Sequence, residues 1–268
     1  MPSTRRAVVA GLAWSAPAVV VAASAPAFAV SPRCLKPATV TWNSTSYQRS
    51  SEKPQGTYTV ADPDGAAGPL KGMTITVANT FTGGNTYLSQ QFLPTGATTR
   101  PSLNLTAYTR NPSVGGASGP LALHQAPKEN TAKSDLLTTD ANKTITTFTF
   151  SQPVTSLSFS IADIDSAASD FRDAVALVSA TPYTATIRNT ATVTGNGTLN
   201  TPWRAVSPTA PVPDSSTDGT VDVRFAGTVK EFAIHYWNIA PASQSASTVD
   251  GDQAVFISNL QLTYDACS

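Results

Sequence analysis

Charged side chains are scarce in this sequence, and neither sign predominates. They make up 13% of the 268 residues, with 17 basic and 17 acidic side chains. Arg5 and Arg6 fall in a predicted leader, so the rest of the chain carries 15 basic and 17 acidic residues and a net charge near −2. Proteins that bind nucleic acid or anionic membrane surfaces carry a basic patch or stripe. The composition gives no support to either class of partner.

Residue types that carry out enzymatic chemistry are also few. The two histidines, His124 and His235, do not have the spacing of metal ligands, and no G-x-S-x-G motif is present. Glutamate occurs only at Glu52, Glu129 and Glu231. We therefore expect a non-catalytic protein. An aspartate-dependent glycoside hydrolase is the less favoured alternative.

Long apolar runs are absent except near the first residue. There, two arginines precede an Ala/Val-rich segment at 7–25 and the small-x-small motif A-F-A at 27–29, an order typical of a signal peptide. The arginine pair in STRRAVV is similar to a twin-arginine export signal, and the general secretory route stays open. We expect cleavage after residue 29. Residues 30–268 should then be secreted or held at the cell surface, without a membrane span.

Only two cysteines are present, Cys34 and Cys267. In an exported protein such a pair is expected to form a disulfide, here between the two ends of the mature chain. Free thiols and an intermolecular link are the alternatives.

Helical patterns are scarce, whereas Thr, Ser, Gly and Pro are abundant. About ten to twelve segments alternate apolar and polar residues, the period of a strand with one buried face. We expect residues 30–268 to form a single all-β domain. The predicted architecture is an antiparallel two-sheet sandwich, jelly-roll-like.

The stretch 144–178 has the clearest alternation. Phe148 and Phe150 precede a Ser-Gln-Pro turn, and Leu157, Phe159 and Ile161 alternate with polar residues after it, which predicts a β-hairpin with one buried face. The segment FSQPVTSLSFSIAD is echoed 75 residues later by FAGTVKEFAIHYWN, with Asp163 matched to Asn238. If the echo is structural, both second strands run the same way and end at one rim. The alternative is that any two half-buried hairpins look alike.

Acidic residues gather where these strands are predicted to end. Carboxylates in close proximity raise one another's pKa unless a cation lies among them, and an extracellular oxygen-rich site favours Ca²⁺. The alternative is that Asp163 and Asp165 cap a turn with Arg172 as an ion-pair partner. The candidate ligands for Ca²⁺ are Asp163, Asp165, Asp170, Asp173, Asn238, Asp250 and Asp252.

Tryptophans are the other candidate ligand-binding residues, because an indole ring stacks on the apolar face of a sugar. Trp203 in a Pro-rich loop and Trp237 beside Asn238 are the candidates for glycan contact. For each, burial in the core is the alternative. Trp42 lies within a predicted strand and is expected to be buried.

The run FTFSQPVTSLSFSIADIDS, then FRDAVAL, VRFAGTVKEFAIHYWN and QAVFISNLQLTYDAC, resembles a group of secreted actinobacterial surface proteins with a jelly-roll-like domain. The resemblance covers residues 144–267 and implies an exported β-sandwich without a settled biochemical role. The segment VFISNLQLTY is also similar to closing strands of jelly-roll carbohydrate-binding modules. Ser258 stands where those modules have an Asp ligand for calcium.

Together these features predict an exported, non-catalytic β-sandwich that binds a polysaccharide of the cell envelope or the environment, or a surface protein, as an adhesin-like module. Stabilisation by Ca²⁺ is part of this prediction. The main alternative is a structural component of the cell envelope that has no ligand.

Overall fold

The computed structural model describes residues 34–50, 54–82, 104–109, 113–124, 143–168, 171–207, 210–239 and 253–267. Every described residue belongs to the unit Arg33–Ser268. The predicted leader, residues 1–29, lies outside the described residues.

The described residues form fourteen β-strands and no helix, so the all-β prediction is confirmed. Every strand pairing is antiparallel. Within this part of the chain, no helix is available that could cross a membrane. The strands are β1 (Leu35–Val40), β2 (Tyr47–Arg49), β3 (Gln55–Val60), β4 (Met73–Phe81), β5 (Leu121–His124), β6 (Thr144–Ala162), β7 (Asp173–Val178), β8 (Tyr183–Ile187), β9 (Val193–Thr194), β10 (Trp203–Ala205), β11 (Val221–Phe225), β12 (Val229–Asn238), β13 (Ala254–Ile257) and β14 (Leu260–Asp265).

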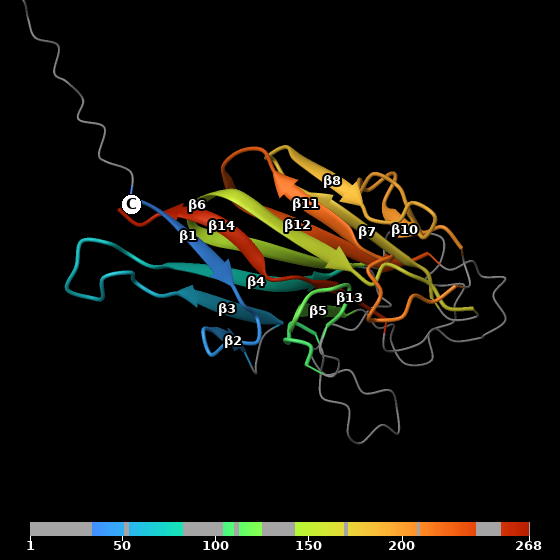
Figure 1. The fold of residues 1–268 in the computed structure, drawn as a ribbon, viewed down its shortest axis with the longest axis horizontal. Helices are drawn as coiled ribbons and strands as arrows, with labels where there is room; N and C mark the ends of the chain where they lie inside the picture. Colours follow the sequence, from blue (N-terminus) through green and yellow to red (C-terminus); the bar gives the residue numbers. More distant parts are fainter. Residues whose placement is uncertain are drawn as a thin grey trace, which may run out of the picture. The chain divides into compact units, whose positions relative to one another are not determined.

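The long strand β6 belongs to both layers of the fold. Its first arm pairs with β4 and β12, in the layer β2-β3-β4-β6-β12-β7-β10-β9. Its second arm pairs with β11, β13 and β14, and through them with β8, β5 and β1. Figure 1 shows β6 turning back on itself between the two layers. This arrangement is consistent with the predicted sandwich, while the jelly-roll order stays a prediction.

The predicted hairpin at residues 151–153 is wrong in one respect. The chain does reverse there, but the two arms of β6 do not pair with each other, because each finds its partners in a different layer. Three residues further on, Ser156 takes a left-handed conformation, with φ of 52°, where the register between β6 and β14 shifts. The hairpin predicted for the echo is wrong in the same respect, because β11 and β12 also lie in different layers and are not paired.

Aromatic side chains fill the space between the layers. Phe232 of β12 stacks on Phe148 of the same layer, with ring centroids 4.6 Å apart. From the other layer, the rings of Phe159 and Phe225 lie 5.1 and 5.5 Å from that of Phe232. The alternation in β6 is thus explained, because the buried parity faces this aromatic core. Trp42 is buried in the same core, as predicted.

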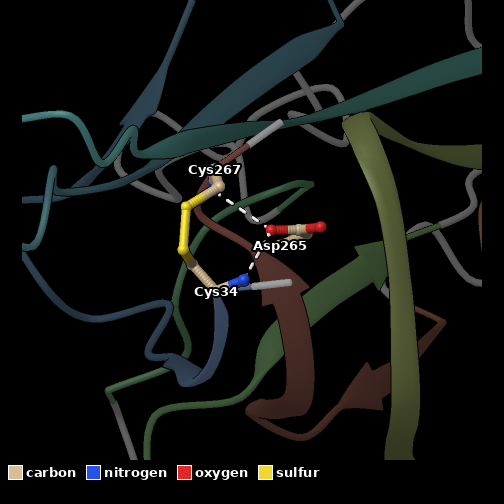
Figure 2. Close-up of side chains that lie close together, drawn as sticks. All are labelled: Cys34, Asp265 and Cys267. Carbon is tan, nitrogen blue, oxygen red and sulfur yellow. Dashed lines mark hydrogen bonds between the residues drawn. A yellow bond between two sulfur atoms is a disulfide. The ribbon is translucent and has the colours of Figure 1, made fainter. Parts of the chain in front are cut away.

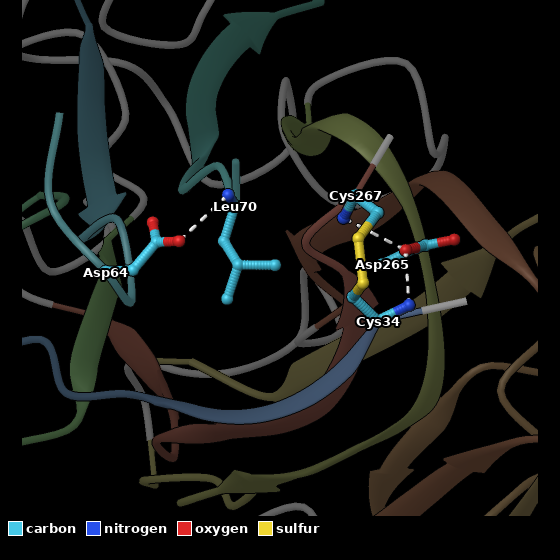
Figure 3. Close-up of a disulfide and its surroundings, with 5 residues drawn as sticks. All are labelled: Cys34, Asp64, Leu70, Asp265 and Cys267. Carbon is cyan, nitrogen blue, oxygen red and sulfur yellow. Dashed lines mark hydrogen bonds between the residues drawn. A yellow bond between two sulfur atoms is a disulfide. The ribbon is translucent and has the colours of Figure 1, made fainter. Parts of the chain in front are cut away.

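The first and last strands close the sandwich. β1 pairs with β14 from Leu35 opposite Asp265 to Val40 opposite Leu260. The predicted Cys34–Cys267 disulfide is present beside this pair, and the Asp265 Oδ1 atom accepts hydrogen bonds from both cysteine N–H groups at 3.0 and 3.1 Å (Figure 2). The turn before β4 lies nearby, where the Leu70 N–H donates to Asp64 at 3.2 Å (Figure 3). We call the disulfide and the Asp265 carboxylate the disulfide clamp. It joins the first and last strands of the domain.

Candidate functional site at the acidic end

The second arm of β6 and the strand β12 end at the same rim, as the echo predicted. The Asp165 N–H, just after β6, donates to Asp173 Oδ2 at 3.1 Å. The Asp173 N–H donates to the Asp165 carbonyl at 3.0 Å, and Asp173 is paired in register with Asn238, the last residue of β12. These residues and Asp163 form what we call the acidic end. Asp170, Asp250 and Asp252 lie outside the described residues.

Asp173 is the most deeply buried member of the acidic end. Its Oδ1 atom accepts hydrogen bonds from the Tyr236 hydroxyl at 2.8 Å and from Gln253 Nε2 at 2.7 Å. Burial, reinforced by the nearby Asp165 carboxyl, raises the pKa of Asp173 well above its ordinary value. Burial also raises the pKa of Tyr236, so this phenol stays protonated and acts as a donor. Asp173 therefore holds the ends of β7, β12 and β13 together.

Asp165 is also buried, at 6% exposed, whereas Asp163 is half-buried, and the environments of the two carboxyls differ. The Oδ2 atom of Asp165 accepts a hydrogen bond from the Val212 N–H at 2.7 Å. Burial raises the pKa of Asp165 to about 6, although this hydrogen bond opposes the rise. The Asp163 carboxyl makes no hydrogen bond or ion pair within the described structure. Burial, with smaller contributions from Asp165 and Asp214, raises the pKa of Asp163 to about 8.

Arg172 does not neutralise these carboxyls, so this part of the turn-capping alternative is wrong. Its guanidinium donates to the Ala205 carbonyl from Nε at 3.1 Å and from Nη2 at 2.7 Å. The Nη2 atom also donates to the Val206 carbonyl at 3.1 Å. The Arg172 N–H donates to Asn238 Oδ1 at 3.1 Å. Arg172 thus ties the rim to the end of β10, since unpaired backbone carbonyls there need donors.

The described part of the acidic end does not make up a calcium site by itself. Calcium takes six to eight oxygen ligands, and most oxygens of Asp173 and Asp165 already accept hydrogen bonds from the chain. In the described ranges, the one group of three or more Asp, Glu, His or Cys side chains whose candidate ligand atoms lie within 4.8 Å of one another is Cys34, Asp265 and Cys267, and both of its cysteines are held in the disulfide. Calcium binding stays a prediction.

Three residues of this end were missed by the sequence analysis: Asp214, Tyr236 and Gln253. Tyr236 belongs to the alternating apolar positions of β12, and it is fully buried. A buried tyrosine hydroxyl usually finds a polar partner, and this was the signal available for it. Asp214 and Gln253 lie in or beside loops far apart in the sequence, and no spacing connects them to Asp163.

The two candidate sugar-stacking tryptophans are buried. Trp203 is 1% exposed and Trp237 3% exposed, so neither offers a ring face to a ligand in this structure. Trp203 packs against Gly197, where an added Cβ would lie within 2.3 Å of the indole ring. Trp237 lies under Lys143, whose Nζ atom is 5.3 Å from the ring centroid. The structure therefore gives no support to a sugar platform at these positions and agrees with the core alternative.

The acidic end predicts that stability falls as pH rises. Unfolded aspartates ionise near pH 4, whereas folded Asp165 and Asp163 keep their protons up to about pH 6 and 8. The folded state thus binds more protons than the unfolded state in this window, and stability is lost as the pH passes through it. We expect the Tm to fall by several degrees between pH 5 and pH 8, measured by calorimetry in buffers with chelator.

Asp163→Asn separates this effect from other pH effects. Asn tolerates the left-handed conformation of residue 163, where φ is 68°, and cannot ionise. The variant should match the wild type at pH 5 and exceed its Tm at pH 8. Asp218→Asn, at an exposed position, is the control. Parallel profiles of Tm against pH for the wild type and Asp163→Asn would refute the assignment of this pH dependence to Asp163.

No protein-family model, curated protein or solved structure matches this chain.

Proposed function

We propose that the chain is an exported, non-catalytic β-sandwich module of the cell envelope that binds a neutral polysaccharide. The predicted leader and the Cys34–Cys267 disulfide support an oxidising, extracytoplasmic location. The balanced charge supports a neutral ligand rather than a polyanion. The resemblance to secreted actinobacterial surface proteins points in the same direction.

The observation that carries this proposal is a row of hydroxyl groups on the outer face of one layer. Thr57, Thr76 and Thr149 lie opposite one another on the paired strands β3, β4 and β6. A second row places Thr59 opposite Thr74. The face alternates with the buried positions of each strand, so these side chains point away from the core. The threonine face consists of Thr57, Thr59, Thr74, Thr76, Thr147 and Thr149.

Threonine hydroxyls suit a glycan because each donates one hydrogen bond and accepts others, as sugar hydroxyls do. The strands hold neighbouring threonines of one row about 4.8 Å apart without further ordering on binding. At one end of the first row, the Thr149 hydroxyl donates to Glu231 Oε2 at 2.9 Å. Because its proton is engaged in this bond, the Thr149 oxygen is fixed as a hydrogen-bond acceptor. Contact through hydroxyls also agrees with the burial of Trp203 and Trp237.

A hydrolase has less support. Glycosidases need two carboxyl groups that flank a sugar bond in an open cleft. Asp173 is fully buried and hydrogen-bonded within the chain, which commits it to holding strand ends. The acidic end therefore supports a structural role.

The test is retention of the mature chain on insoluble cell-wall and plant polysaccharides. The triple variant Thr57→Val, Thr76→Val and Thr149→Val removes the row while keeping shape and strand propensity. We expect retention to fall at least tenfold, which is the loss of about 1.4 kcal/mol of binding free energy. Thr39→Val with Thr263→Val, on the other layer, is the matched control. Equal retention of both variants and the wild type, or no retention on any polysaccharide, would contradict the proposal.

A further inference from the structure

The strand β8 has an open edge. β8, residues Tyr183–Ile187, pairs with β11 on one side. The Arg188 N–H donates to the Thr220 carbonyl at 3.0 Å, and the Ala226 N–H donates to the Pro182 carbonyl at 2.9 Å. In an antiparallel ladder this fixes the even-numbered residues of β8 as those bonded to β11.

The odd-numbered residues therefore point their backbone groups the other way. The N–H and C=O groups of Tyr183, Ala185 and Ile187 face the free side of β8, where no described strand lies. Figure 1 shows β8 at the border of its layer. The central residues of β8 are exposed, and the strand carries no charged side chain. Such an edge is a template for another strand.

The opposite edge of the same layer, at β1, is protected against pairing with a further strand, and β8 can be compared with it. At β1, the Ala266 N–H donates to the Cys34 carbonyl, so Leu35, Pro37 and Thr39 are the residues that face the free side. Pro37 has no N–H group at the centre of that edge. The Thr39 carbonyl accepts a hydrogen bond from the Tyr58 hydroxyl at 3.3 Å. Among the described residues, neither protection is found at β8.

We propose that β8 pairs with β8 of a second copy of this chain, antiparallel about a two-fold axis at Ala185. In this register the free N–H and C=O groups of Ala185 bond to those of the second Ala185. Thr184 of one copy lies opposite Thr186 of the other, a favourable cross-strand pair. The layer that contains β8 in one copy then forms one continuous sheet with the same layer of the other copy. The pair has two-fold symmetry, the closed symmetry that most homodimers have.

In this register opposite charges stand at the two ends of each row, and Asp222 is also ion-paired with Arg188 of its own copy at 2.8 Å. On β11, Arg224 lies beside Thr184 and Asp222 beside Thr186. The two-fold axis therefore places Arg224 of one copy in the same row as Asp222 of the other, on the same face of the sheet. No like charges meet along the paired strands. A parallel β8 pair would lack this alternation of opposite charges.

The interface is short, because β8 has five residues. We expect a weak dimer with a dissociation constant on the order of 10–100 μM, below the strength of standard interfaces. The experiment is sedimentation velocity of the mature chain, residues 30–268, over a concentration series up to about 1 mM. The expected result is a reversible shift from monomer to dimer mass.

Ala185→Pro tests the edge directly. Its ring replaces an N–H group that is not bonded to β11, so the domain keeps its own ladder. We expect at least tenfold weaker association, with an unchanged circular dichroism spectrum.

Charge variants test the register. Thr184→Lys with Thr186→Lys places like charges opposite each other and should abolish the dimer. Thr184→Lys with Thr186→Glu places opposite charges there and should restore it. Leu35→Lys on β1 is the control and should leave association unchanged. A wild type that stays monomeric at every concentration, or a dimer that Ala185→Pro and the two-lysine variant leave intact, would overturn the proposal.

Discussion

Replacing Cys34 and Cys267 by serine is expected to lower the free energy of unfolding by about 5 kcal/mol. The disulfide joins residues 233 positions apart, and the loss of chain entropy in the unfolded state grows with the length of the loop that is closed. For a domain of this size, each kcal/mol shifts the Tm by about 2–4 °C. We therefore expect a fall of roughly 10–20 °C, measured by calorimetry with the wild type before and after reduction.

A matched control separates the covalent bond from its surroundings. Asp265→Asn keeps the disulfide and changes the carboxylate that accepts the two cysteine N–H groups. Its effect should stay below about 3 kcal/mol, the upper end of the range for hydrogen bonds to a charged group, because the Asn Oδ1 atom can still accept. A double-serine variant within 2–3 °C of the wild type would show that β1 and β14 hold the ends together without the bond.

Phe232→Ala should have the second-largest effect. The ring of Phe232 contacts Phe148 in its own layer and Phe159 and Phe225 in the other, so its removal leaves a cavity between the layers. Such substitutions cost about 3–5 kcal/mol, from lost burial and from the cavity. Denaturant unfolding gives this value as a shift in midpoint at constant slope.

Phe232→Leu fills part of the space and should cost less than half as much as Phe232→Ala. The control for apolar truncation in general is Leu199→Ala, since Leu199 is 40% exposed. Surface substitutions of this kind stay within about 0.5 kcal/mol. Similar losses for Phe232→Ala and Leu199→Ala would mean that the two layers are not held together by the aromatic core.

The sequence predicted the buried parity of β6 correctly but not the pairing of its arms. Phe148 and Phe159 alternate with polar residues in the same way whether the arms form a hairpin or lie in two layers. Which arrangement occurs depends on strands far away in the chain, such as β4 and β11. Local periodicity carries no information about those partners.

The acidic end was predictable in part, from the local pattern of the two strands that end there. The echo placed Asp163 and Asn238 at one rim, because equal parity and length bring two strands to equal ends. Arg172 was assigned to the carboxyls on charge alone, whereas the structure gives it to the carbonyls of Ala205 and Val206. Charges can be read from the sequence, whereas the backbone carbonyls that need a hydrogen-bond donor are determined by the fold.

The double membership of β6 has a consequence for how the domain comes apart. Detaching the layer that contains β4 and β12 strips the first arm of its ladder, and detaching the other layer strips the second arm. The two arms belong to one continuous strand. Because of this, the loss of strand pairing in one layer also destabilises β6 in the other layer. We therefore expect the two layers to unfold together in one cooperative transition.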